Sequence, residues 1–389
     1  MRGARLTASI PATTDTARDK PRLEALTGLR WWAAFWVFAY HLRALIDIPA
    51  PLLWPIEFGY LGVTFFFVLS GFVLTWSMSS SVSLSTFYTR RFARIWPSHM
   101  VALALAIPVF YALSPQLDHD WVKPFDPGVL ALSVPLAQGW SRNPDILFSG
   151  NPAAWTLSCE LFFYALHPFI ARAMVRLHQR GALLVAAGSI VVAVAYRFAC
   201  NQDPSAWWSA YMPWPISRLP EFVVGVAIAW ALRSGWRPRV RLWPTVAVFL
   251  AGVAAISVVP RRMPENAAVS FAADFSNEFM TALCALVIVG VAVSSLAGRR
   301  TWLASGPMVR LGLWSYAFYL VHATVIYAVL NVRGGVTGTL PSIGWTVAAL
   351  GGGLVVAYLL HRWVEFPAER GLRRWKDRRD AAQVPSVVR

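Results

Sequence analysis

Two residues able to do chemistry stand in one apolar stretch, LTGLRWWAAFWVFAYHL at 26–42: Arg30 near its start and His41 near its end. They are eleven residues apart. At about 100° per residue an α-helix turns roughly 1100° over that interval, so the two side chains share one face. Imidazole serves as a general base, and ionisable side chains inside a membrane usually mark a functional site. For the pair we favour function over the alternative, in which Arg30 snorkels to the membrane surface and His41 bonds to a carbonyl group.

Three further ionisable residues in apolar segments, Glu160, His322 and Glu221, are expected near the depth of His41. A rise of about 1.5 Å per residue puts each of them in the outer half of the membrane. A carboxylate beside a neutral imidazole fixes its tautomer and makes it a better base for activating a hydroxyl group, so we expect Glu160 to orient His41. The alternatives are that Glu160 and His322 bond only to backbone groups, and that Glu221 only pairs with Arg218, three residues before it.

A basic cluster precedes another apolar segment, in FYTRRFARIWP at 87–97. Arg91 and Arg94 lie on one helical face, directly after Arg90. Guanidinium groups suit phosphate oxygens, so with Arg30 these arginines predict a site for a phosphorylated cytoplasmic cofactor. For any one of them, the ordinary alternative is a topogenic signal that keeps the loop on the cytoplasmic side.

The elements that must position these side chains are membrane helices. Of the 389 residues 57% are hydrophobic and only 14% are charged, whereas soluble domains carry about 25% charged residues. We predict an all-α, polytopic bundle of ten spans, with an interfacial or re-entrant piece at 128–140 and an eleventh span there as the alternative. The predicted spans are 29–48, 58–78, 95–114, 155–175, 182–200, 216–232, 243–259, 279–297, 311–330 and 343–364.

Lysine and arginine are divided unequally between the two sides of these spans. The side with both termini holds 26 of them and the other side 5. Since cytoplasmic segments carry the excess, we predict cytoplasmic termini and a plasma-membrane location, and we assign the net charge of +16 to topology rather than to nucleic-acid binding. The predicted divisions are a disordered tail (1–22), a transmembrane domain (23–366) and a basic tail (367–389) that suits anionic lipid.

The three cysteines, Cys159, Cys200 and Cys284, have neither the spacing of a zinc site nor that of a disulfide framework, so we expect no metal. Residues 1–22 lack the apolar core of a cleavable signal peptide. We therefore expect the first span to act as its own signal anchor.

Seven segments, taken in order, resemble the acyltransferase 3 family of integral-membrane O-acyltransferases. Together they extend over nearly all of the chain. Each alone is a weak pattern, whereas the ordered combination is highly specific. The segments are LTGLRWWAAFWVFAYH (26–41), FFFVLSGFVLT (65–75), FYTRRFARIWP (87–97), WTLSCELFFYALHP (155–168), RLPEFVVG (218–225), SYAFYLVH (315–322) and VEFPAE (364–369).

The resemblance implies transfer of an acyl group, usually from acyl-CoA, to a hydroxyl group of a sugar or other acceptor. It makes His41 the essential histidine and Glu160 the acid of the WSLSVE-type motif. Acyl-CoA is then a co-substrate, and no permanently bound cofactor is expected. The residues assigned to acyl-CoA are Arg30, Arg90, Arg91 and Arg94. Those assigned to the acceptor are Arg218, Glu221, Tyr316 and His322.

One motif departs from the family pattern. Many relatives follow the acid with a second acidic residue and a glutamine, where this chain has Leu161 and Phe162, so one carboxylate remains there. The length is similar to that of stand-alone members without an SGNH-type domain, which include enzymes that acylate sugars or lactones of macrolide-type antibiotics. Direct transfer and an acyl-histidine intermediate both stay open. The rival class is a transporter or flippase, which predicts inverted repeats that this sequence does not show.

Overall fold

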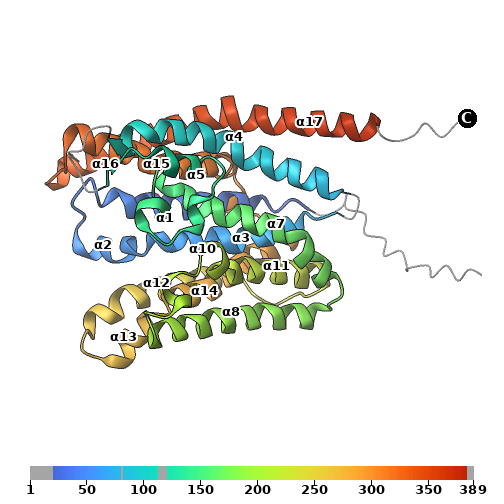
Figure 1. Cartoon of the computed structure of the whole chain (residues 1–389). Coiled ribbons are helices and arrows are strands. Elements are labelled where there is room, and N and C mark those ends of the chain that lie inside the picture. Colours follow the sequence, from blue (N-terminus) through green and yellow to red (C-terminus); the bar gives the residue numbers. More distant parts are fainter. Residues whose placement is uncertain (1–20, 80–81, 113–120, 383–389) are drawn as a thin grey trace, which may run out of the picture.

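The computed structural model describes residues 21–79, 82–112 and 121–382, and these form a bundle of long helices (Figure 1). Most of the long helices are strongly apolar, as helices of a membrane bundle are, whereas the C-terminal one, Phe366–Ala382, is basic. The long helices are α1 (Glu24–Leu42), α3 (Gly62–Trp76), α4 (Leu84–Phe110), α7 (Trp155–Val175), α8 (Gln179–Gln202), α11 (Leu219–Arg233), α12 (Leu242–Arg262), α14 (Ser276–Leu296), α15 (Gly306–Arg333), α16 (Thr339–Leu360) and α17 (Phe366–Ala382).

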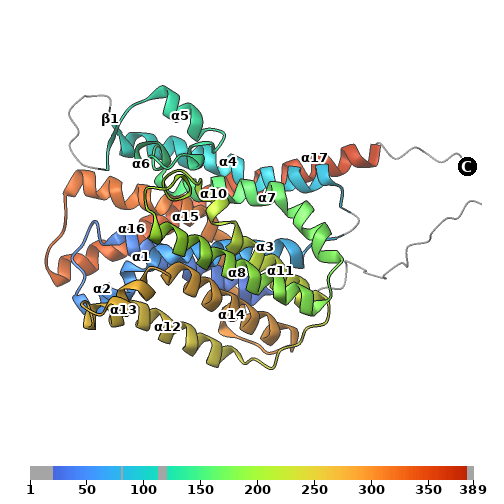
Figure 2. The same cartoon turned by 60° about the horizontal axis from the view of Figure 1, so that its bottom comes forward.

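Short elements connect the long helices. Single turns of 3-10 helix precede α3, α7 and α15, and a π-helical turn, His361–Glu365, joins α16 to α17. Two short strands pair in parallel beside α5 and α6, and Figure 2 shows this group at one corner of the bundle. The short elements are α2 (Ala50–Glu57), β1 (Tyr111–Ala112), β2 (Lys123–Pro124), α5 (Pro127–Ser133), α6 (Pro144–Leu147), α9 (Trp207–Ala210), α10 (Trp214–Ser217) and α13 (Ala267–Ala273).

Eight helical segments of the described chain are long and apolar enough to cross a membrane. They coincide with eight of the ten predicted spans. The other two predicted spans fall on α1 and α7, which are helical but carry more polar side chains, including Arg30, His41 and Glu160. The number of ten therefore stays a prediction.

Residues 128–140 do not form an eleventh span. The only α-helix there is α5, which has seven residues and is followed by a turn and the 3-10 helix Gln138–Trp140. A spanning helix needs about 20 residues. Leu136 and Gln138 are buried against the bundle, so the segment folds into the protein and returns.

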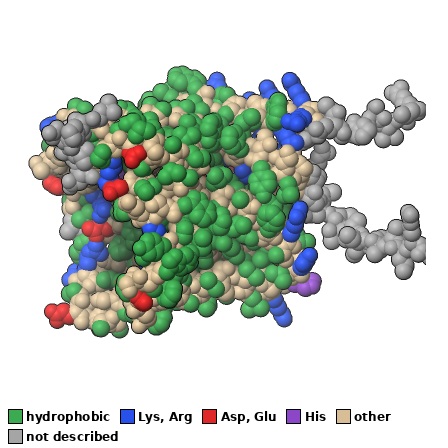
Figure 3. Space-filling model, viewed as in Figure 1, with side chains coloured by type: hydrophobic (Ala, Val, Ile, Leu, Met, Phe, Trp, Pro, Cys, Tyr) green, Lys and Arg blue, Asp and Glu red, His purple; other side chains and the backbone are tan. Residues whose placement is uncertain are grey.

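The two ends of the bundle differ in charge. Figure 1 shows the free end of α17 and the α7–α8 turn at one end, and α2 and α13 at the other. On the face drawn in Figure 3, acidic side chains are visible mainly at the α2 end, whereas basic side chains are visible at both ends. The sidedness predicted from the lysine and arginine counts stays a prediction. Residues 1–20 of the predicted N-terminal tail lie outside the described residues.

Residues 367–382 of the segment that we predicted as a basic tail are helical, and residues 383–389 lie outside the described residues. Helix α17 continues from the π-helical turn and packs along α4. It therefore covers the part of α4 that carries the basic cluster.

Close helix crossings depend on glycine. A Cβ atom on Gly225 of α11 would lie 1.9 Å from the carbonyl oxygen of Val68 in α3, and one on Gly71 would lie 2.1 Å from the carbonyl oxygen of Phe222. Small residues at such interfaces let helix backbones approach each other. This crossing fixes α11, and with it Arg218 and Glu221 at its start, against the centre of the bundle.

Replacing Gly225 with alanine is expected to destabilise the protein by about 1–3 kcal/mol, because the added methyl group meets backbone rather than a movable side chain. Thermal unfolding in detergent measures the effect. The matched control is Gly188→Ala on α8, where an added Cβ meets nothing within 4 Å. There the higher helix propensity of alanine should raise stability by up to about 1 kcal/mol. Equal melting temperatures for both variants would contradict the tight crossing.

Candidate active site

Helix α1 carries Arg30 and His41 on one face, as their spacing predicts, and it packs against α3, α14 and α15. The helix ends at Leu42 rather than continuing to residue 48. His41 therefore lies in the last turn of α1 and not well inside a longer helix. Both side chains are half-buried. They are separated by roughly 16 Å along the helix axis, since each residue adds about 1.5 Å.

The side chain beside His41 is His322. The two imidazole rings have their centroids 5.2 Å apart. His322 is fully buried, and its Nδ1–H donates to the carbonyl oxygen of Tyr319 at 2.7 Å. A neutral histidine that donates from one nitrogen has a lone pair on the other. That nitrogen, Nε2, has no hydrogen-bond partner among the described residues, so a basic nitrogen of fixed tautomer lies next to His41.

Glu160 does not lie beside His41, so our expectation that it orients this histidine is wrong in this structure. Its carboxylate interacts electrostatically with Arg30 and Arg94 and lies near the hydroxyl groups of Ser70 and Tyr164. Glu160 thus belongs with Arg30, about three helical turns from His41 along α1.

The physical reason is the depth at which α7 begins. We placed Trp155 at the membrane surface, but the residues before it are buried inside the bundle. Asn151 is 0% exposed and donates from Nδ2 to the carbonyl oxygen of Leu320 at 2.8 Å. Leu320 lies in the middle of α15, two residues before His322. Helix α7 therefore starts at the level of the histidine pair, and Glu160 lies deeper than a surface start predicts.

Arg94 is bound by carboxylates of the chain itself. Its Nη1 donates to Glu365 and, at 3.0 Å, to Glu369. Its guanidinium also lies 4.9 Å from the ring centre of Tyr316, whose hydroxyl donates to the carbonyl oxygen of Ile95. Tyr316, which we assigned to the acceptor, therefore lies in the basic cluster. Both carboxylates belong to the segment VEFPAE, but nothing in the sequence indicated that Arg94 is their partner.

Arg91 points into the bundle and Arg90 points to its edge. The Arg91 guanidinium lies 5.7 Å from the ring of Tyr164 and 5.8 Å from that of Phe87, and its Nε has no hydrogen-bond partner among the described residues. Arg90 instead lies 3.7 Å from Asp377 of α17. The structure thus brings Arg30, Arg91, Arg94 and Glu160 together around Tyr164 and leaves Arg90 at the periphery.

Arg218 and Glu221 form the pair that we considered as an alternative, within a larger network. Arg218 Nε lies 2.9 Å from Glu221 Oε1, and Asn277 Nδ2 donates to the same oxygen at 2.8 Å. Arg218 also donates to Asn277 Oδ1 and to Thr64 Oγ1. Sequence reasoning missed Asn277 and Thr64, because neither belongs to a charged pattern.

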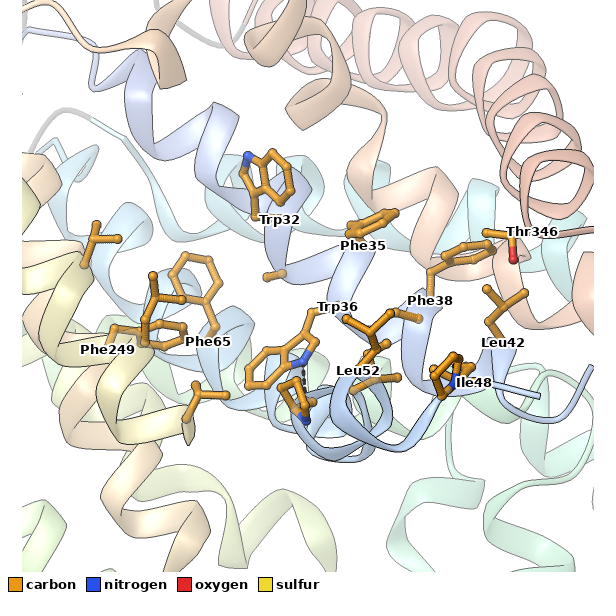
Figure 4. A pocket seen from close by; sticks show the side chains of 18 of the residues that line it. Trp32, Phe35, Trp36, Phe38, Leu42, Ile48, Leu52, Phe65, Phe249 and Thr346 are labelled. Carbon is orange, nitrogen blue, oxygen red and sulfur yellow. Dashed lines mark hydrogen bonds between the residues drawn. The ribbon is translucent and has the colours of Figure 1, made fainter. Parts of the chain in front are cut away.

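A large apolar cavity of about 1060 Å³ lies on the opposite face of α1 (Figure 4). Trp32, Trp36 and Phe38 of α1 line it with residues of α2, α12 and α16, and Trp36 Nε1 donates to the carbonyl oxygen of Pro55. The residues of α1 that line it point mainly away from the face of Arg30 and His41. The cavity is therefore separated from the histidine pair by the helix.

The fold and the site define an integral membrane protein built as a helix bundle, with a histidine pair towards one end and an arginine cluster towards the other. The chain belongs to the acyltransferase 3 family, since the model of the family's acyltransferase domain matches residues 23–362. It is therefore a membrane O-acyltransferase.

Two relatives extend this comparison. The chain is 34% identical to the acyltransferase MdmB of Streptomyces mycarofaciens, over 94% of this chain and 95% of that protein. It is 22% identical to the O-acetyltransferase OatA of Staphylococcus aureus, over 90% of this chain but only 57% of that longer protein. No solved structure matches the chain.

Proposed function

We propose that this O-acyltransferase transfers an acyl group from acyl-CoA to a hydroxyl group of a sugar-containing acceptor, which is a cell-surface glycan, a glycolipid or a macrolide-type natural product, with His41 as general base. The observation that carries the proposal is the contact of His41 with His322, whose Nε2 lone pair is uncommitted. Two adjacent imidazoles with one free lone pair are equipped to accept and return a proton.

The reaction is a proton-assisted acyl exchange. His41 accepts the proton of the acceptor hydroxyl while its oxygen attacks the thioester carbonyl carbon. The carbon–sulfur bond then breaks, and the proton passes from the His41 imidazolium to the departing thiolate. The Nε2 lone pair of His322 is available to accept a hydrogen bond from the His41 ring, which favours the imidazolium during the transfer.

The donor binds along α1 in this proposal. The phosphates of CoA lie near Arg91 and Arg30, and the thioester arm extends along the shared face to His41, roughly 16 Å away. Arg94 is held by Glu365 and Glu369, so its main effect is to fix α17 over the cluster. Both termini are cytoplasmic in this proposal, in keeping with the excess of lysine and arginine in the segments on their side of the predicted spans.

The function is tested with the purified full-length protein in detergent and radiolabelled acetyl-CoA. Thioester cleavage that requires an added extract of hydroxylated compounds supports the proposal and allows the acceptor to be isolated. Specific binding of several acyl-CoA lengths without turnover would overturn it.

Replacing Arg91 with alanine is expected to weaken acyl-CoA binding by about 10- to 100-fold, because a hydrogen bond to a charged group contributes about 1.5–3 kcal/mol. The dissociation constant of CoA, measured by calorimetry, reports this loss. The control is Arg172→Ala, an exposed arginine on α7. An unchanged affinity in the Arg91 variant would leave Arg91 as a topogenic residue only.

A further inference from the structure

A second, small cavity lies apart from the histidine pair, between α8, α10, α11 and α14. Its volume is about 90 Å³, and its lining is mostly polar and charged. The charged groups nearly balance, with three guanidinium groups and two carboxylates. The lining residues that matter here are Arg142, Arg197, Trp214, Arg218, Glu221 and Glu278.

Both carboxylates have one oxygen without a partner. Glu221 is only 3% exposed, and its Oε1 is engaged by Arg218 and Asn277. Glu278 is 6% exposed, and its Oε1 lies 3.7 Å from Arg197 Nε. The Oε2 atoms of both residues have no hydrogen-bond partner among the described residues. Buried carboxylate oxygens are costly unless they accept hydrogen bonds, so this cavity is built to receive hydrogen-bond donors.

The remaining walls narrow the chemistry of the ligand. The Arg142 guanidinium lies 4.2 Å from the ring centre of Trp214 and offers donors at the rim beside an aromatic surface. Two carboxylates disfavour a phosphate, and three guanidinium groups disfavour a cation. Hydroxyl groups both donate and accept hydrogen bonds, so they match carboxylates and guanidinium groups together. A neutral ring that bears several hydroxyl groups can form hydrogen bonds with both the carboxylates and the guanidinium groups of this cavity.

Tyr319 links the cavity to the histidine pair. It interacts electrostatically with Arg218, which lines the cavity. Tyr319 in turn lies 5.7 Å from His322. The cavity is therefore a few side chains from the proposed site of acyl transfer.

We infer that this cavity binds a sugar ring of the acceptor, with Oε2 of Glu221 and Oε2 of Glu278 accepting hydrogen bonds from its hydroxyl groups. The inference rests on the proposed function, since it names the acceptor class of that same enzyme. It adds Glu278, Arg142 and Trp214 to the residues that recognise the acceptor.

The test is direct binding of methyl hexopyranosides to the full-length protein in nanodiscs, without sugar-based detergent. Thermal shift and saturation-transfer NMR with a panel of epimers measure the affinity. At least one epimer should bind, and Glu278→Gln should weaken it by tenfold or more, because the amide replaces a charged acceptor. The matched control is Glu265→Gln, an exposed glutamate in the turn after α12, which should bind like the wild type.

The affinity for CoA, measured on the same samples, separates this inference from the proposed function. If the protein binds CoA but no glycoside, or binds glycosides equally well in the wild type and in Glu278→Gln, the sugar site is overturned and the proposed function is not. If the wild type does not bind CoA, the result counts against the proposed function itself. If Glu278→Gln does not fold, Arg142→Ala at the rim of the cavity takes its place, and unchanged glycoside affinity there has the same meaning.

Discussion

Replacing His41 with alanine is expected to lower acyl transfer by about 10²- to 10⁴-fold, the usual contribution of a positioned general base. The fold should persist, because His41 is half-buried in the last turn of α1 and its ring fills no closed core position. Loss of label from radiolabelled acetyl-CoA measures transfer, and thermal unfolding measures the fold.

The control for this variant is His178→Ala, an exposed histidine at the start of α8. That change should leave both transfer and stability at the wild-type level. Turnover retained in the His41 variant would remove His41 from the chemistry. It would leave the arginine cluster as a donor site without an assigned base.

Replacing His322 with phenylalanine is expected to lower the turnover number by about 10- to 100-fold, because one hydrogen bond to a charged imidazolium contributes about 1.5–3 kcal/mol. The ring contact with Phe318 can persist in this variant, but the lone pair beside His41 is lost. The KM for acyl-CoA should not change, because the donor phosphates bind at the far end of the shared face.

Two further variants separate a positioning role for His322 from a packing role. His322→Gln keeps an acceptor near the position of Nε2 and should recover part of the turnover. Glu160→Gln should alter acyl-CoA binding rather than the step that depends on His322, because Glu160 lies with Arg30. Equal turnover in the phenylalanine and glutamine variants would show that His322 only fills space.

Local periodicity was enough to predict the shared face of Arg30 and His41. Both residues lie on one regular helix, and helix geometry alone relates residues eleven positions apart. The same reasoning predicted helices for the ten apolar segments and placed Arg91 and Arg94 on one face of α4.

The partners of these residues could not be predicted in this way. Glu160 was misplaced because its depth depends on where α7 begins, and that is set by the burial of Asn151 against α15. The neighbour of His41 is decided by the packing of α1 on α15, whereas the sequence placed Glu160 and His322 only at similar depths and led us to expect Glu160. Tertiary contacts of this kind depend on how the helices pack against each other, and the periodicity of one segment carries no information about that packing.

The ion pairs of Arg94 also constrain how the protein is made. Its carboxylate partners, Glu365 and Glu369, follow it by 271 and 275 residues. At about 5–20 residues per second, the ribosome needs on the order of tens of seconds to reach them. During that interval Arg94 is an uncompensated cation at the inner part of α4, and it is most stable in water or among lipid headgroups. The same charge that favours water or lipid headgroups around this part of α4 during insertion later holds α17 against it, so these ion pairs form only after α17 has been made.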